Sequence, residues 1–341
     1  MLRKGVIMQA VHIGIVGAGS IGCFMAAVLA QQANIKVTLV ARSHQLGSLQ
    51  TSGISARWPQ GTTQQHYVEV TDSAVSLTDC DLIVIAVKAT ALEPTLRELK
   101  DLIPSRPPLL LVQNGVGIRE LAATVVNNSL YRAVVPYNVV QVQPGVFEQT
   151  SAGILCLEQS SLPVIKQLAD AFEQGPGVQQ FPDIHTVEYG KLLLNLNNAL
   201  NALSDIPLKD QLETYEWRRI LAAAMREWLL ICKRSHIKPF KMTNVSPRLI
   251  PWLLELPDWI FLRIAAAMLQ VDPKARLSMW YDFVADKPTE IDFLNGAVVR
   301  LGQQHQVPTP VNQWIYDQIT KRRYDPQQVL DPRVCCRLLG L

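Results

Sequence analysis

One lysine and two asparagines are aligned on a leucine-rich segment in the second half of the chain. The segment Glu188–Asn198 reads EYGKLLLNLNN, and a helix of 3.6 residues per turn places Lys191, Asn195 and Asn198 on one stripe. Polar groups on a largely buried helix are destabilising unless they are paired. The stripe therefore predicts contact with a polar ligand, or else a helix–helix hydrogen-bond network in which Lys191 pairs with Glu188.

A glycine turn near the amino terminus has the spacing of a phosphate-binding loop. It lies between a strand-like run, 12–16, and a helical run, 21–32. In such a turn the first glycine permits the tight bend, the second lets a pyrophosphate approach the backbone, and the third allows close helix–strand packing. Backbone N–H groups at the helix start bind the phosphates. We therefore expect a dinucleotide to contact Gly17, Ala18, Gly19, Ser20, Ile21 and Gly22.

The end of the second predicted strand indicates which dinucleotide binds. An NAD site places Asp or Glu there, about 20 residues on, to bind the ribose 2′-hydroxyl. The segment Leu39–Ser43 has no acid, and Arg42 stands 20 residues after Gly22. A guanidinium suits a 2′-phosphate because it can form two parallel hydrogen bonds. The sequence favours NADP(H), with a solvated Arg42 as the alternative.

Two more polar residues follow predicted strands. Lys88 follows 83–87, and Asn114 follows 109–112 within a Gln-Asn-Gly sequence. Ligands of open α/β sheets bind beyond the carboxyl ends of the strands, so both residues could reach cofactor or substrate. Asn-Gly is also a common turn pair, and each residue alone could be ordinary turn chemistry.

The carboxy-terminal part of the chain adds a serine and a glutamate. Ser278 precedes Glu290 by twelve positions, and Pro288 is expected to begin a helix whose apolar stripe includes Ile291 and Leu294. A glutamate in that first turn could simply interact with the helix dipole.

Composition excludes several classes of protein. The 341 residues are 48% hydrophobic and 18% charged, which fits two folded domains rather than a disordered chain. A net charge of +3 is too small to act as an electrostatic footprint for nucleic acid or anionic membrane. The six cysteines show no metal-ligand or disulfide-scaffold spacing, and no histidines cluster, so we expect no metal and reduced thiols.

The amino-terminal stretch contains no charged residue between Lys4 and Lys36, which resembles a signal peptide or membrane span. Its glycines divide it into a strand-length run and a helix-length run, the pattern of a buried strand, turn and helix. No other stretch is as long and apolar as a spanning helix. We therefore expect a cytoplasmic protein without a membrane partner, and the sequence leaves a homodimer open.

Hydrophobic periodicity divides the chain in two. Strand-like and helical runs alternate in the first half, which implies a mostly parallel sheet. After Gly175-Pro176-Gly177, taken as a linker, apolar residues recur only at helical spacing. We predict an α/β Rossmann-type doubly wound sheet in residues 1–180 and an all-α helical domain in residues 181–341. Strands are expected at 12–16, 36–40, 82–87, 109–112, 131–142 and 154–157, and helices at 21–32, 93–102, 187–203, 212–231, 260–269 and 291–301.

These motifs, in this order over nearly the whole chain, resemble the ketopantoate reductase (2-dehydropantoate 2-reductase) family. The resemblance implies an NADPH-binding Rossmann domain and a helical domain that enclose a cleft. It further implies that a 2-oxo acid, 2-dehydropantoate above all, is reduced to the hydroxy acid, a step of pantothenate biosynthesis. Reduction of a ketone develops alkoxide charge, which a cationic donor stabilises and then protonates.

The resemblance assigns a role to each candidate residue. Lys191 would be the general acid, and Glu290 would orient it or contact the nicotinamide ribose. Asn114 would lie where nicotinamide and substrate meet. The cofactor would be bound by the glycine turn with Arg42 and Lys88, and the substrate by Asn195, Asn198 and Ser278.

The chain departs from the family pattern at three substrate positions. Asparagines expected there fall on Ala199, on Leu208 or Lys209, and on Ala275. These changes leave the reductase mechanism intact but allow a larger or more apolar 2-oxo acid.

Two other functions share parts of this pattern. A 3-hydroxyacid or glycerol-phosphate dehydrogenase has a similar architecture, and a phosphorylated substrate would need cations near Lys191, for which Lys209, Arg218 and Arg219 are the candidates. A non-catalytic NADPH-binding sensor would bind cofactor and turn over no ketone.

Overall fold

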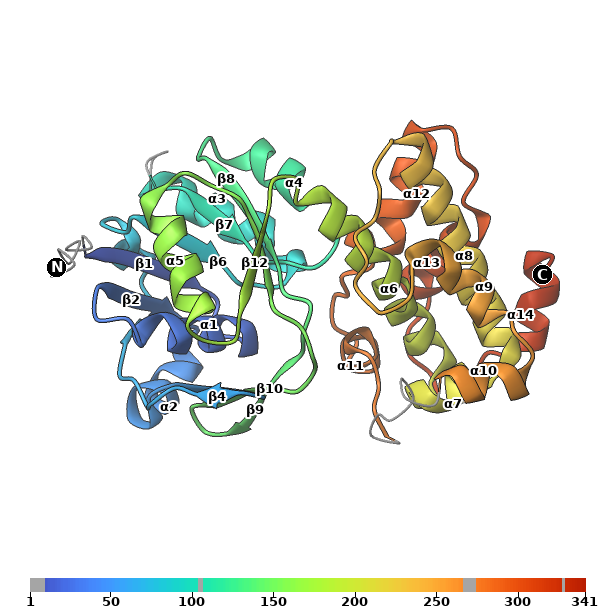
Figure 1. The fold of residues 1–341 in the computed structure, drawn as a ribbon, viewed down its shortest axis with the longest axis horizontal. Helices are drawn as coiled ribbons and strands as arrows, with labels where there is room; N and C mark the ends of the chain where they lie inside the picture. Colours follow the sequence, from blue (N-terminus) through green and yellow to red (C-terminus); the bar gives the residue numbers. More distant parts are fainter. Residues whose placement is uncertain (1–9, 104–106, 266–273, 327–328) are drawn as a thin grey trace, which may run out of the picture. The chain divides into compact units, whose positions relative to one another are not determined.

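The computed structural model describes residues 10–103, 107–265, 274–326 and 329–341, which form two compact units (Figure 1). The first unit comprises the chain up to Gln113 together with Ile118–Ile184. The second comprises His185–Leu341 and also the short segment Asn114–Gly117.

An eight-stranded sheet forms the centre of the first unit. Its order is β12-β11-β8-β7-β6-β1-β2-β5, and neighbouring strands are parallel except at the β11–β8 pair. From β5 to β8 the sheet has the doubly wound strand order, which reverses between β1 and β6, where ligands of such sheets bind. The strands are β1 (Val11–Val16), β2 (Ile35–Val40), β5 (Glu69–Thr71), β6 (Leu82–Ile85), β7 (Leu109–Leu111), β8 (Leu130–Val134), β11 (Leu155–Glu158) and β12 (Val178–Phe181).

Helices cover the two faces of this sheet. On one face α1 (Ser20–Ala30) packs with α5 (Pro163–Glu173), and both join one hydrophobic core with Ile13 and Ile15 of β1. Gly14, between these two isoleucines, faces the opposite side, where Leu77 and Cys80 pack. On that side α3 (Leu92–Leu102) packs with α4 (Ile118–Val125). The buried strand, turn and helix expected at the amino terminus are therefore present as β1 and α1.

A smaller four-stranded sheet in the same unit was not expected from the sequence. Its order is β4-β3-β10-β9, and the α1 helix contacts it through β3, β9 and β10. The prediction of one strand at 131–142 is wrong, because β8 and β9 belong to different sheets and Pro136, which lacks an N–H donor, lies between them. The strands are β3 (Ser55–Trp58), β4 (Gly61–Thr62), β9 (Val139–Gln143) and β10 (Val146–Gln149).

The interpretation of 175–177 as an interdomain linker is also wrong. This segment is the turn between α5 and β12, where Gly177 has φ +97° and donates its N–H to the Phe172 carbonyl at 2.7 Å. The β12 strand then pairs in parallel with β11. Gln179 and Gln180 hide this strand from a search for apolar runs, and the chain enters the second unit only at His185.

The described part of the second unit is helical. Its core surrounds α6 (His185–Ser204) and α8 (Tyr215–Arg234), which pack together and bury Trp228, Leu196 and Leu200. The predicted helix 212–231 is two helices, because Thr214 has an extended backbone that ends α7 before α8 begins. The other helices are α7 (Leu208–Glu213), α9 (Ile250–Leu254), α10 (Asp258–Ala265), α11 (Ser278–Val284), α12 (Asn295–Gln304), α13 (Pro310–Lys321) and α14 (Pro332–Leu339). The 3₁₀ turn η3 (Pro247–Leu249) precedes α9, and the 3₁₀ turn η4 (Ile291–Phe293) precedes α12. Of the predicted helix 260–269, the part beyond Ala265 lies outside the described residues.

The expected helix start at Pro288 is wrong. The η4 turn comes first, and α12 begins only at Asn295, after Leu294 with φ −109° and ψ −102°. The Phe293 carbonyl accepts the Val116 N–H at 3.0 Å, so it is engaged outside the helix. Glu290 therefore precedes a short turn and does not stand in the first turn of an α-helix.

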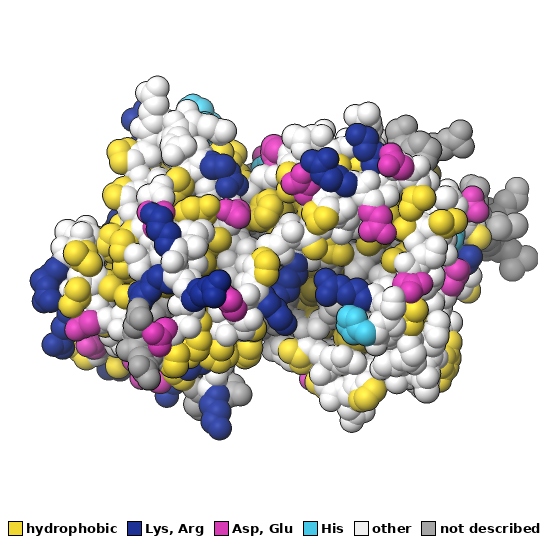
Figure 2. All heavy atoms as spheres, turned by 180° about the vertical axis from the view of Figure 1, so that it is seen from behind, with side chains coloured by type: hydrophobic (Ala, Val, Ile, Leu, Met, Phe, Trp, Pro, Cys, Tyr) yellow, Lys and Arg dark blue, Asp and Glu magenta, His cyan; other side chains and the backbone are white. Residues whose placement is uncertain are grey.

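The described residues contain no helix with the length and apolar character needed to cross a membrane, and no cluster of three or more His, Cys, Asp or Glu that could hold a metal ion. All six cysteines are buried and unbridged. On the face shown in Figure 2, acidic and basic side chains are interspersed rather than gathered into one basic surface.

Candidate active site

The glycine turn after β1 is shaped by contacts at its first and third glycines. Gly17 has φ +109°, and a Cβ there would lie 2.9 Å from the backbone of Ala86 and Val87. A Cβ on Gly22 would lie 2.0 Å from the Gly17 carbonyl oxygen. At Gly19, by contrast, a Cβ would meet no described atom within 4 Å. The first and third glycines are thus required for packing, whereas the second leaves the backbone open to a ligand.

The start of α1 fits the pyrophosphate of a dinucleotide. The helix begins at Ser20 with Gly19 as its N-cap, and no side chain caps it. The first N–H groups of a helix have no partner within the helix, and together with the helix dipole they favour an anion. The turn is also joined to the second strand, since the Gly17 N–H donates to the Val40 carbonyl at 3.0 Å.

Arg42 lies at the end of β2, beside this turn. It is exposed and directly precedes α2 (Ser43–Ser52), and no described carboxylate lies within ion-pair distance of it. Gln45 connects the two segments, because its amide donates to the Ala18 carbonyl at 3.2 Å and accepts from the Arg42 N–H at 3.4 Å. A guanidinium so placed fits a 2′-phosphate. Sequence reasoning missed Gln45, although its position three residues into α2 is a usual capping position.

Lys88 follows β6, on the other side of the glycine turn. It is exposed and stands directly before a short 3₁₀ turn, Ala89–Ala91. The buried Gln113 fixes the preceding backbone, because its amide donates to the Ile85 and Val87 carbonyls at 2.7 and 3.1 Å. The Gln113 Oε1 atom is buried and has no described hydrogen-bond partner.

A fully buried arginine holds the backbone that leads to Asn114. Arg132 of β8 is 0% exposed, and its guanidinium donates to the Leu111 and Gln113 carbonyls, each at 2.9 Å. This residue was not predicted, and an arginine inside an apolar strand is the signal that could have indicated it. Gln113 and Arg132 therefore fix the ends of β6 and β7, where Lys88 and Asn114 follow.

Asn114 and Glu290 lie on adjoining segments of the second unit. Gly115 has φ +96°, and a Cβ there would lie 2.4 Å from the Phe293 carbonyl oxygen. Together with the Val116–Phe293 hydrogen bond, this contact fastens Asn114–Gly117 to the η4 turn that Glu290 precedes.

The polar stripe of α6 is present as predicted. Lys191, Asn195 and Asn198 are half-buried, and Leu194 beside them is the one other half-buried residue from Val187 to Ser204. The Asn195 Nδ2 atom is itself buried and has no described partner. Glu188 is buried and its carboxylate lies 2.9 Å from His185 Nδ1. A helix buried on all other sides therefore presents one cation and two amides along a single face.

Ser278 is the first residue of α11, which packs against α6. The residue before it, Leu277, donates its N–H to Asn201 of α6 at 2.9 Å. The described second unit thus contains Asn114, Glu290, Ser278 and the α6 stripe, whereas the glycine turn, Arg42 and Lys88 belong to the first.

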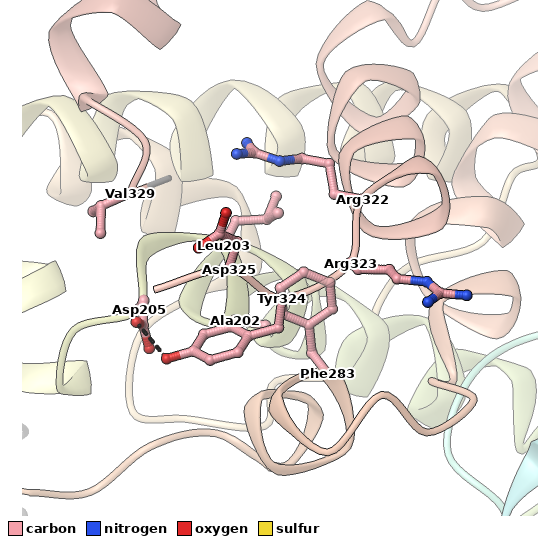
Figure 3. A pocket seen from close by; sticks show the side chains of 9 residues that line it. All are labelled: Ala202, Leu203, Asp205, Phe283, Arg322, Arg323, Tyr324, Asp325 and Val329. Carbon is pink, nitrogen blue, oxygen red and sulfur yellow. Dashed lines mark hydrogen bonds between the residues drawn. The ribbon is translucent and has the colours of Figure 1, made fainter. Parts of the chain in front are cut away.

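Asp205, directly after α6, is a polar junction that sequence reasoning missed. It has φ +52°, and its carboxylate accepts from Trp280 Nε1 at 2.7 Å, Tyr324 OH at 3.0 Å and Arg276 at 3.3 Å. Figure 3 shows the Tyr324 contact among the residues that line a small pocket. Desolvation, together with the hydrogen bond to Asp205, raises the pKa of the Tyr324 phenol.

The cations needed for a phosphorylated substrate are engaged elsewhere. Arg218 is fully buried and donates to the Leu254 carbonyl and the Asp258 carboxylate. The Lys209 Nζ atom lies 3.8 Å from the Glu213 Oε1 atom, and the Arg219 guanidinium lies over the Tyr215 ring. These positions do not favour a glycerol-phosphate type of substrate.

A doubly wound sheet with a glycine turn at its switch point, followed by a helical unit with a cationic polar stripe, defines a two-domain, dinucleotide-dependent oxidoreductase. Two sequence models of one family match the chain: "Ketopantoate reductase PanE/ApbA" over residues 13–161 and its "C terminal" counterpart over residues 183–323. The chain belongs to the ketopantoate reductase family. It is accordingly an oxidoreductase that acts on a CH–OH group with NADP(H).

Comparison with individual proteins agrees with this membership. The 2-dehydropantoate 2-reductase of Halobacterium salinarum is 24% identical over 317 residues, which are 91% of this chain and 98% of that protein. A ketopantoate reductase from Ralstonia eutropha shares the fold with a TM-score of 0.76 at 23% identity, over 91% of this chain and 97% of the other. A D-mandelate dehydrogenase solved with NADH and anilino(oxo)acetate has a TM-score of 0.71 at 22% identity, over 91% of this chain and 97% of the other.

Proposed function

We propose that this chain reduces a 2-oxo acid to the corresponding 2-hydroxy acid with NADPH, that 2-dehydropantoate is its principal substrate, and that Lys191 is the general acid. The observation that carries the proposal is the face of α6, where Lys191, Asn195 and Asn198 are, with Leu194, the half-buried residues between Val187 and Ser204. The curated relative from Halobacterium salinarum, named for this reaction, supports it.

The cofactor would be held by the first unit. Gly17–Gly22 with the start of α1 would bind the pyrophosphate, Arg42 the 2′-phosphate, and Lys88 a further cofactor group. When bound, NADPH supplies the hydride. The protein's own contribution is to orient the substrate and to place charge and a proton donor at its carbonyl oxygen.

In this proposal the Lys191 ammonium stabilises the negative charge that develops on the substrate oxygen and then donates its proton to that atom. Asn195, Asn198 and Ser278 hold the substrate. Glu290 orients Lys191 or contacts the ribose, and Asn114, on the segment adjoining that of Glu290, contacts nicotinamide and substrate.

The substrate positions that differ from the family pattern widen the range of acids to test. Ala199 is fully buried in the helical core, and the backbone N–H of Leu208 donates to the Ala275 carbonyl at 2.9 Å. Alanine at two of the positions expected to be amides, and Leu208 or Lys209 at the third, favour a larger or more apolar 2-oxo acid as the alternative substrate.

The test is NADPH oxidation by purified protein with a panel of 2-oxo acids that includes 2-dehydropantoate and phenylglyoxylate, with the hydroxy acid product quantified. We expect one hydroxy acid per NADPH consumed and a higher kcat/KM with NADPH than with NADH. Cofactor binding without turnover of any acid in the panel would contradict the proposal and favour the sensor. A cytoplasmic location and a homodimer remain predictions.

A further inference from the structure

A chain of buried amides links α6 to α7 within the second unit. Gln211 donates to Asn197 Oδ1 at 2.7 Å, and Asn201 Nδ2 donates to Gln211 Oε1 at 2.9 Å. Asn201 Nδ2 also donates to the Ile206 carbonyl at 3.1 Å. Asn201, Gln211 and Asn197 are 0%, 1% and 7% exposed, so water cannot replace these bonds and the Asn201 carboxamide is held in one orientation.

The remaining oxygen of this network is directed at α11. Asn201 Oδ1 accepts the N–H of Leu277, the N-cap residue of α11, at 2.9 Å. No side chain of α11 caps its own first turn. In a capping box a glutamate within the helix accepts the N-cap N–H, and here an asparagine of another helix does so. A seven-residue helix is marginal by itself, so the position of its first turn depends on this outside contact.

Asn201 lies close to the polar stripe of α6. It follows Asn198 by three residues, a rise of about 4.5 Å along the helix. Ser278 directly follows Leu277, whose N–H is bonded to this residue of α6. The other side of Ser278 is held as well, because Trp280 donates to Asp205, which Figure 3 shows bonded to Tyr324.

We infer that Asn201 is a positioning residue, which fixes the Ser278 hydroxyl relative to Lys191, Asn195 and Asn198. The inference rests on the proposed function, in which Ser278 holds the substrate. Asn201 does not touch the substrate, and it acts by holding the first turn of α11 at a set height along α6.

The kinetic test is Asn201→Leu, which keeps the approximate volume of the side chain and removes its hydrogen bonds. Loss of an interaction made equally in ground and transition states raises KM and leaves kcat unchanged. We expect about a tenfold rise in KM for the 2-oxo acid, kcat within about threefold of wild type, and an unchanged Kd for NADPH.

The matched control is Asn312→Leu. Asn312 is also 0% exposed, and it donates to the Ala224 carbonyl of α8 and to Glu227, away from α11. This variant should lose thermal stability while KM stays within about twofold of wild type. Equal KM values in the two leucine variants would overturn the inference, because Asn201 would then be only structural.

A double-mutant cycle tests whether Asn201 acts through Ser278. Ser278→Ala alone should raise KM by about tenfold, and the two substitutions together should raise it little further, because they remove one interaction. Multiplicative effects would overturn the inference. Should Asn201→Leu fail to fold, Asn201→Ser serves instead, since its hydroxyl is too short to reach Leu277.

Hydrogen exchange separates this inference from the proposed function. In Asn201→Leu the hydrogen-bonded amides of Leu277 and Trp280 should exchange at least tenfold faster, and those of α8 should be unaffected. Unchanged protection of the Leu277 and Trp280 amides would overturn the inference whichever substrate the wild type uses. A wild type that reduces no 2-oxo acid would overturn the proposed function. Hydrogen exchange alone would then test whether Asn201 holds the first turn of α11.

Discussion

The two units present their candidate ligand groups in different ways. In the first unit the groups around the glycine turn are mainly backbone N–H donors, arranged by close packing at Gly17 and Gly22. In the second unit they are side chains on α6 and α11, held by buried polar bonds such as that of Asn201. A backbone site needs a specific local sequence, whereas a side-chain site also needs contacts between distant segments. The first kind of site can therefore be recognised from a short sequence motif, whereas the second depends on contacts that a motif does not show.

The largest effect is expected from a substitution that disrupts the packed glycine turn of the first unit. Gly22→Ala would bring a Cβ to 2.0 Å from the Gly17 carbonyl, which cannot be accommodated without moving β1 or α1. We expect several kcal/mol of destabilisation and little folded protein. Circular dichroism with thermal unfolding measures this loss.

Gly19→Ala is the matched variant, since its Cβ meets no described atom. It should change the unfolding midpoint only slightly and weaken NADPH binding at least tenfold, because the methyl group occupies the approach to the backbone. Equal stability losses in the two variants would contradict the distinction drawn between these glycines.

A second prediction concerns the buried arginine of the first unit. Arg132→Met should lower the free energy of unfolding by about 2–5 kcal/mol, because it leaves the Leu111 and Gln113 carbonyls buried without donors. Arg97→Met is the control, since the Arg97 side chain is 68% exposed and pairs with Glu93 on the surface, so the substitution should cost less than about 1 kcal/mol. Chemical denaturation measures both, and similar losses would show that Arg132 does not hold these strand ends.

The third prediction concerns whether the first unit distinguishes NADPH from NADH. Arg42→Ala should weaken NADPH binding by about 10- to 100-fold, the loss expected for a charge-assisted bond of about 1.5–3 kcal/mol, and leave NADH binding nearly unchanged. Calorimetric titration with both cofactors measures the difference. An equal effect on NADPH and NADH would mean that Arg42 does not recognise the 2′-phosphate.

The smallest expected effect is a pH dependence in the second unit. Burial raises the pKa of the Glu227 carboxyl, although it accepts bonds from Val311 and Asn312. A pKa raised on folding means that the folded state binds more protons, so this contribution to stability is full below the unfolded pKa of about 4.5 and declines as pH rises through the folded value. The stability difference between wild type and Glu227→Gln should therefore shift against wild type from pH 4 to pH 7. A difference that does not vary with pH would contradict this assignment.

The sequence predicted what depends on short-range patterns. The β1 strand, the glycine turn, α1 and the α6 stripe each follow from spacing within about a dozen residues, and the structure has all four. Prediction from the sequence failed where contacts between residues far apart in the chain determine the structure. The helix containing α12 was predicted to start too early, because the N–H of Val116, far away in the sequence, donates a hydrogen bond to the Phe293 carbonyl. Asn201 and Arg132 were missed because their partners lie 76 and 19–21 positions away.

The measurement that tests the central claim most directly is single-turnover reduction of 2-dehydropantoate by wild type and Lys191→Ala, each saturated with NADPH. A general acid is expected to contribute at least about 10²-fold, so the variant should bind NADPH normally and react at least a hundredfold more slowly, while Lys321→Ala, which removes an exposed lysine paired with Asp317, reacts at the wild-type rate. Reduction by Lys191→Ala at the wild-type rate would contradict the claim that this lysine supplies the proton.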